Sequence, residues 1–149
     1  MNELRERVLA YLAQHRVLTL ATCANNGVWA AAVFYASVDL NLYFLSAPHT
    51  RHARDMAANP QVAGTIQEDY AQWLAIKGIQ LEGTVKRLAG AAQEEAITQY
   101  LAKYPFIAEG DGDLVKALER SGWYRLTPSR LYFIDNSRGL GHRDELQIE

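Results

Sequence analysis

A group of hydroxyl and cationic side chains lies within the seven residues SAPHTRH, residues 46–52. Ser46 and Thr50 supply hydroxyl groups that can donate hydrogen bonds. Arg51 supplies a planar fork of N–H donors that matches the geometry of a phosphate, and His52 supplies an imidazole. Donors of these types at this spacing are suited to holding an anion, and phosphate in particular.

The residues that follow predict a helix over 50–58. Thr50 stands at the expected N-cap, and Asn59-Pro60 ends the segment because proline disfavours helical geometry in the residue before it. A helix N-terminus already carries a partial positive charge, so added cations are unfavourable there unless an anion binds. Two interpretations remain open: a phosphate site at a strand–loop–helix junction, or a basic surface turn that pairs with Asp55 or with solvent.

Length and composition limit the classes of protein. With 149 residues, 49% of them hydrophobic, the chain is expected to form a single domain over residues 1–149 with a buried core. A net charge of −2 gives no reason to expect nucleic acid as a partner. The N-terminus lacks a signal-peptide pattern and no run of ~18 apolar residues occurs, so we expect a cytoplasmic protein without a membrane span.

The single cysteine and the histidines give little sign of other chemistry. Cys23 cannot form an intrachain disulfide, and its apolar surroundings predict a small core residue rather than a nucleophile. His49 and His52 have a spacing that metal ligands use on helices, but no third ligand is near in sequence and the neighbouring arginines repel a cation. We therefore predict no metal site.

The elements that must position the 46–52 group follow from the apolar pattern. Helical periodicity alternates with short β-branched stretches, and short connections such as NNG at 25–27 favour antiparallel pairing. About six mostly antiparallel strands in a small domain tend to close into a barrel, which removes exposed edges. The expected helices cover 3–15, 50–58, 91–104 and 111–122, and the expected strands cover 17–23, 28–38, 40–47, 61–67, 73–88 and 123–135.

Three local features refine this outline. Gly78 and Gly83 predict bulges or bends in the long strand 73–88. Pro128 predicts an interruption of the last strand, because proline cannot donate to a sheet. The tail over 136–149 is polar and broken by glycines, and we expect no strand in it.

The segment LYFLSAPHTRHARDMAANPQVAGTI resembles the pyridoxamine 5'-phosphate oxidase-like family of FMN-binding split barrels. Its order is a strand ending in a hydroxyl residue, a short loop, Thr-Arg-His, a short helix, Asn-Pro and a second apolar strand. The stretch IQLEGTVKRL resembles a further strand of that family, and the resemblance covers roughly residues 17–101. The tail DNSRGLGHRDEL resembles a small uncharacterised bacterial subgroup. The fold implied is mainly β (α+β): a six-stranded antiparallel split β-barrel with flanking helices.

The resemblance implies a homodimer with FMN at the subunit interface. The family's phosphate-binding positions match the 46–52 group, with His52 where many members carry lysine. The flavin ring would lie along 30–33, where small side chains let a planar ring approach, although tight packing against a helix explains the alanines equally well. The residues matched to FMN in this way are Ala30, Ala31, Ala32, Val33, Ser46, Thr50, Arg51 and His52.

Other matched positions depart from the oxidases. Tyr35 stands where they place a phosphate-contacting lysine, and it offers a hydroxyl without a charge. Their flavin-contacting glutamine from the second subunit matches Gly78, and the adjacent Lys77 would stabilise a reduced anionic flavin unless it is an ordinary surface lysine. Trp73 would stack on the partner's flavin or be buried at the dimer interface.

The function implied by the resemblance is a flavin-dependent oxidoreductase acting on a small-molecule substrate or NAD(P)H. The oxidases' C-terminal Arg-x-His signature has no counterpart, since His142 and Arg143 stand in the reverse order. No residue stands out as a catalytic acid or base. Two alternatives stay open: a non-catalytic flavin-binding or sensor protein, and a split barrel that binds haem or a deazaflavin, with His142 as the candidate haem ligand.

Overall fold

The computed structural model describes residues 3–110 and 112–148. In this part of the chain, eight strands form one sheet in which every pairing is antiparallel. The strands are β1 (Val17–Ala24), β2 (Gly27–Phe34), β3 (Ala36–Val38), β4 (Asn41–Ser46), β5 (Gln61–Gln67), β6 (Lys77–Arg87), β7 (Gly122–Asp135) and β8 (Arg143–Leu146).

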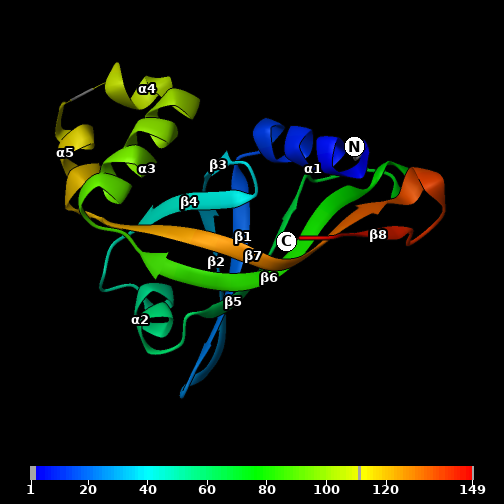
Figure 1. The fold of residues 1–149 in the computed structure, drawn as a ribbon, viewed down its shortest axis with the longest axis horizontal. Helices are drawn as coiled ribbons and strands as arrows, with labels where there is room; N and C mark the ends of the chain where they lie inside the picture. The colour runs from blue at the N-terminus through cyan, green and yellow to red at the C-terminus, as the bar shows by residue number, and fades with distance from the viewer. Residues whose placement is uncertain (1–2, 111, 149) are drawn as a thin grey trace.

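The sheet curls into a half-barrel with helices around it (Figure 1). Its strand order is β2-β1-β5-β6-β7-β4-β3, with β8 added beside β7, so β2 lies at an edge. No helix among the described residues is long and apolar enough to cross a membrane. The helices are α1 (Glu3–Gln14), α2 (Arg51–Ala58), α3 (Gly90–Lys103), α4 (Pro105–Ala108) and α5 (Gly112–Arg120), and the 3₁₀ turns are η1 (Trp73–Ala75) and η2 (Asn136–Arg138).

Two hydrophobic clusters hold these elements in place. The larger one fills the barrel beneath α1, and the smaller one lies between α3 and β7. Tyr35 belongs to the larger cluster, where its fully buried side chain donates a hydrogen bond from the hydroxyl to Leu12 O at 2.7 Å. Lys103 of α3 donates to the carbonyls of Leu12 and His15. The C-terminal end of α1 is thereby fixed over the start of β1.

The predicted split barrel is confirmed as a fold, with two strands more than the six expected. The stretch 28–38 divides into β2 and β3 because Tyr35 turns into the core between them, where its N–H donates to Arg16 O. The tail, expected to lack a strand, contributes β8, which pairs with the last part of β7. Of the predicted helix 111–122, α5 covers Gly112–Arg120, and residue 111 lies outside the described residues.

The predicted irregularity in the long strand lies at Gly83. The register of β6 against β7 shifts between Glu82 and Gly83, and a Cβ on Gly83 would lie 2.2 Å from Thr127 O. Pro128 pairs opposite Gly83 at this shift, so β7 continues through the proline instead of being interrupted there. Gly78 shows no register shift, and strand β6 begins only at Lys77, because 73–75 forms the turn η1.

Cys23 is exposed, so its predicted core position is wrong. The side chains of β1 alternate between the two faces of the sheet, and Thr22 takes the buried position next to Cys23. The same alternation brings Thr22 against α2.

Candidate functional site

The site begins where β4 ends at Ser46 and α2 starts at Arg51. Thr50 is the N-cap of α2, as predicted, and its hydroxyl oxygen accepts a hydrogen bond from Ala53 N at 3.3 Å. The same hydroxyl donates to Ala47 O at 2.9 Å, which closes the connecting turn. The first N–H groups of α2 therefore face a short, well-defined loop, and N–H groups in a first turn lack partners inside the helix.

Three of the predicted residues converge at this helix end. Ser46 is buried, and its Oγ lies 2.7 Å from His52 Nε2. Thr50 Oγ1 lies 3.5 Å from the same nitrogen. Burial lowers the pKa of the His52 imidazole, and the nearby carboxylate of Asp55 opposes that shift. The free site therefore favours neutral histidine, which an incoming anion would shift toward the charged form.

Arg51 turns toward the β1–β2 hairpin. Its Nη2 donates to Asn26 O at 3.1 Å, and its guanidinium carbon lies 4.5 Å from the centre of the Trp29 ring. Its Nε lies 3.8 Å from Asp55 Oδ2. The pairing with Asp55 foreseen for a basic surface turn thus exists, while among the described residues the Arg51 side chain makes no hydrogen bond to the side chain of Ser46 or His52.

A buried acid supports this arrangement from beneath. Asp55 is 4% exposed, and its Oδ2 accepts a hydrogen bond from Thr22 Oγ1 at 2.9 Å. The pairing of Asp55 with a neighbouring cation was foreseen from the sequence, but the burial of Asp55 and its hydrogen bond with Thr22 were missed. The signals that were present are the two-residue alternation of β1, which turns Thr22 inward, and the four-residue spacing that sets Asp55 beneath Arg51.

The predicted ring-binding strand adjoins the helix end. Ala30 and Ala32 are exposed on the edge strand β2, so these two alanines are not packed beneath a helix. Ala31 and Val33 are partly buried. Because Arg51 contacts Trp29, the residue before the alanines, the small-residue strand and the 46–52 group form one continuous surface.

The remaining predicted residues lie elsewhere in the chain. Tyr35 is in the core, with its hydroxyl bonded to Leu12 O. Figure 1 shows that β6 runs toward the α2 side of the molecule, so its first residue, Lys77, lies at the far end from α2. Trp73 is 73% exposed in η1, beside the same end.

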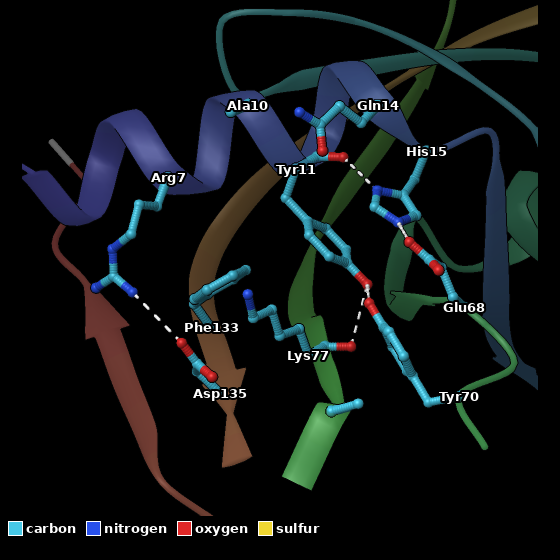
Figure 2. Close-up of a pocket in the computed structure, with 11 residues that line it drawn as sticks. Arg7, Ala10, Tyr11, Gln14, His15, Glu68, Tyr70, Lys77, Phe133 and Asp135 are labelled. Carbon is cyan, nitrogen blue, oxygen red and sulfur yellow. Dashed lines mark hydrogen bonds and ion pairs between the residues drawn. The ribbon is translucent and has the colours of Figure 1, made fainter. Parts of the chain in front are cut away.

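Lys77 lines a second cavity, which we call the α1 pocket (Figure 2). It lies between α1, the loop after β5, the start of β6 and the end of β7. Sequence reasoning did not foresee it. Its main lining residues are Arg7, Tyr11, Tyr70, Lys77, Phe133 and Asp135.

The residues at the N-terminus of α2 fit a phosphate. Ser46 offers a hydroxyl and His52 an imidazole nitrogen next to the first-turn N–H groups, while the Thr50 hydroxyl, which donates to Ala47 O, lies beside them. Arg51 adds a buried Nε that has no hydrogen-bond partner among the described residues. A buried donor left without an acceptor is costly, and an anion at this helix end would supply acceptors.

Comparisons with known proteins identify the family and the fold. A family model described as pyridoxamine 5'-phosphate oxidase matches residues 4–135. A UPF0306 protein of Photorhabdus laumondii is 34% identical over 135 residues, which cover 89% of this chain and 88% of that protein.

Two solved structures share the fold. A haem-binding protein from Mycobacterium smegmatis gives a TM-score of 0.79 at 20% identity, over 99% of this chain but only 59% of its own. An FAD-binding protein from Mesorhizobium loti gives a TM-score of 0.66 at 20% identity, over 89% of this chain and 94% of its own. The two names differ in ligand, so the likeness extends to the half-barrel and no further.

Proposed function

We propose that this chain, which belongs to the pyridoxamine 5'-phosphate oxidase family, binds FMN with the phosphate at the N-terminus of α2. The observation that carries the proposal is the convergence of Ser46, Thr50 and His52 on one point beside the first turn of that helix. A phosphate there would accept hydrogen bonds from the Ser46 hydroxyl and from first-turn N–H groups, and from Thr50 once its hydroxyl is released from Ala47 O. Arg51 would add positive charge from the side of β2.

The flavin ring would lie along the edge strand. Ala30 and Ala32 are exposed and small, so a planar ring could contact the strand closely, with Ala31 and Val33 beneath it. Bound FMN would supply hydride chemistry, and the protein would hold and orient it. Tyr35 is left out of the proposed site because its hydroxyl is bonded inside the core.

A homodimer is part of the proposal. The edge strand exposes Val28, Trp29 and Phe34, which is the kind of apolar surface that a second copy would cover. Lys77 and Trp73 lie at the far end of the sheet from α2, so they would reach a flavin only if a second subunit supplied them. In that arrangement the chain would act as an oxidoreductase on a small molecule or NAD(P)H.

Haem is the second candidate, because a protein of the same fold carries haem in its name. His142 is the histidine to test as its ligand: its side chain is 37% exposed and its Nε2 lies 3.1 Å from Asp144 Oδ2. A carboxylate partner orients an imidazole, as the groups hydrogen-bonded to metal-binding histidines do. A deazaflavin, or a flavin held without turnover, is an alternative ligand for the surface formed by β2 and residues 46–52.

An absorption spectrum separates these candidates. Purified protein is mixed with FMN in one sample and with haem in another, and each is gel-filtered before its spectrum is recorded. The proposal predicts flavin bands at about one FMN per subunit, and oxidation of NAD(P)H would then identify an enzyme. An intense haem band together with no retained flavin would replace FMN by haem.

A further inference from the structure

We propose that the α1 pocket is a second binding site, which takes a small organic anion with a flat aromatic body. The pocket has a volume of about 360 Å³, a size typical of small-ligand sites, which start at roughly 300 Å³. Figure 2 shows its polar side chains arriving from α1, the loop after β5, β6 and β7 around one space. Within one chain the pocket and α2 lie at different ends of the sheet, but in the proposed dimer Lys77 would also reach the partner's flavin, so the pocket is tested on protein free of FMN.

Two cations of the pocket have unused hydrogen-bonding capacity. Arg7 Nη1 lies 3.8 Å from Asp135 Oδ2, and its Nη2 lies 4.0 Å from Asp144 Oδ2, so both ion pairs are too long for hydrogen bonds. Lys77 has no hydrogen bond from its ammonium group to any described residue, and Figure 2 shows that group directed toward Phe133. A carboxylate between the two cations would accept from both.

The acidic groups around the pocket already have other partners. Glu68 Oε2 lies 2.7 Å from His15 Nε2. Asp135 Oδ1 accepts hydrogen bonds from Ser137 N at 3.0 Å and from Ser137 Oγ at 2.6 Å, while its Oδ2 lies 3.7 Å from Arg138 Nε.

The same holds for the carboxylate that reaches the pocket from β8. Asp144 Oδ2 lies 3.1 Å from His142 Nε2 in addition to its long contact with Arg7. Arg7, Lys77 and Arg138 balance Glu68, Asp135 and Asp144 in formal charge, and Lys77 acts electrostatically on Asp135. What favours an anion is unused donor capacity, because Arg7 Nε is buried without a hydrogen-bond partner among the described residues and an anion would bring acceptors.

The pocket also has a rigid aromatic wall. The rings of Tyr11 and Phe133 meet at an angle of 76° with their centres 5.5 Å apart. Tyr11 is held from behind by His15, whose ring stacks on it at 3.8 Å and whose Nδ1 bonds to Tyr11 O at 2.7 Å. An edge-to-face pair of fixed rings suits a flat apolar body.

Hydrogen bonds between two tyrosine hydroxyls fix the side of the pocket formed by the loop after β5. Tyr11 OH donates to Lys77 O at 3.0 Å, so Tyr70 OH, also 3.0 Å away, must donate to Tyr11 OH. This leaves the lone pairs of the Tyr70 oxygen as the outermost acceptors of the chain. The loop after β5 is thereby tied to α1, and the pocket is formed before any ligand arrives.

Benzoate is the probe, because it combines a carboxylate with a flat ring. Backbone amide NMR shifts are followed during titration with benzoate and, separately, with neutral benzamide. The proposal predicts saturable shifts at Ala10, Gln14 and Ala75, which line the pocket, and weaker binding of benzamide. Lys77→Gln and Arg7→Gln should each weaken benzoate binding about tenfold, the effect of losing a charge-assisted hydrogen bond.

The matched control is Lys86→Gln, on the same strand but at its other end, which should leave benzoate affinity unchanged. Lys77 is exposed, so its variant is expected to fold even if Arg7→Gln does not. Absence of saturable shifts at the pocket amides, equal binding of benzamide, or equal affinity in Lys77→Gln and Lys86→Gln would overturn the proposal. Because benzoate carries no phosphate, protein that fails to retain FMN can still give the predicted shifts, which separates the two proposals.

Discussion

The N-terminus of α2 and the α1 pocket gather similar groups, but the chain builds them differently. At α2, the hydroxyls and cations lie within residues 46–52, and one helix start brings them together. At the α1 pocket, the groups come from residues 7–15, 68–77 and 133–135, which only the closed sheet makes adjacent. The comparison shows that a local site can be recognised from spacing, whereas a site formed by topology cannot.

The two regions also differ in how acids balance cations. Asp55, on the buried face of α2, accepts a hydrogen bond from Thr22 and pairs with Arg51. In the α1 pocket, Glu68 is exposed and pairs only with His15 among the described residues. Removing an acid should therefore have unequal consequences in the two regions.

The largest effect is expected for Asp55→Ala. Thr22 and Arg51 would lose their buried acceptor, so the free energy of unfolding should fall by about 2–4 kcal/mol. Glu68→Ala removes an acid of a partly exposed pair and should cost under about 1 kcal/mol. Urea unfolding of both variants measures the difference. An equal fall in the free energy of unfolding would show that the two acids contribute alike to stability.

Arg51→Ala should weaken FMN binding by about 1.5–3 kcal/mol, the range for a lost charge-assisted hydrogen bond. Arg54→Ala is the control on the same helix, since Arg54 is exposed and lines a different cavity with Met56 and Val85. FMN titration followed by flavin fluorescence measures both. Unchanged FMN affinity in Arg51→Ala would show that Arg51 does not bind the phosphate and only links Asp55 to β2.

Tyr70→Phe should lower the free energy of unfolding by about 0.5–1.5 kcal/mol, because the loop after β5 loses its hydrogen bond to Tyr11. Tyr132→Phe is the control, since the Tyr132 hydroxyl makes no hydrogen bond to the described residues and its ring contacts Arg143. Thermal unfolding compares the two. A loss in Tyr132→Phe as large as that in Tyr70→Phe would contradict the hydroxyl chain described for the α1 pocket.

The smallest effect concerns pH. Burial lowers the pKa of His52 in the free protein, so the unfolded chain takes up the proton first and stability falls as pH drops below about 6.5. A bound phosphate favours the imidazolium, so FMN affinity should rise by under about 1 kcal/mol as pH falls from about 8 to about 6.5. His52→Gln should flatten both dependences; a variant that keeps the wild-type slopes would show that another group is responsible.

Local patterns predicted most of the fold. The turn at 25–27, the cap at Thr50 and the alternating strands each act over a few residues, so their outcome is visible in the sequence. The break at Tyr35 and the tail strand β8 were missed because both depend on distant partners. Tyr35 leaves the sheet to reach Leu12, and β8 exists only because β7 offers it an edge.

The same reasoning applies to the sites. Ser46, Thr50 and His52 were foreseen and do meet. The inward position of Thr22 was missed because its apolar neighbours suggested a strand buried on both faces. The alternation of side chains along β1 would have placed Thr22 on the inner face. The contacts among the residues of the α1 pocket span up to 128 positions in the chain, from Arg7 to Asp135, and no spacing rule reaches that far.

The central claim is that α2 binds a phosphate, and the affinity for FMN relative to riboflavin tests it most directly. The two ligands share the flavin ring, and only FMN carries the phosphate. The account predicts that FMN binds at least about tenfold more tightly than riboflavin, and that Ser46→Ala reduces this ratio. Equal affinity for the two ligands, or a ratio that Ser46→Ala leaves unchanged, would contradict it.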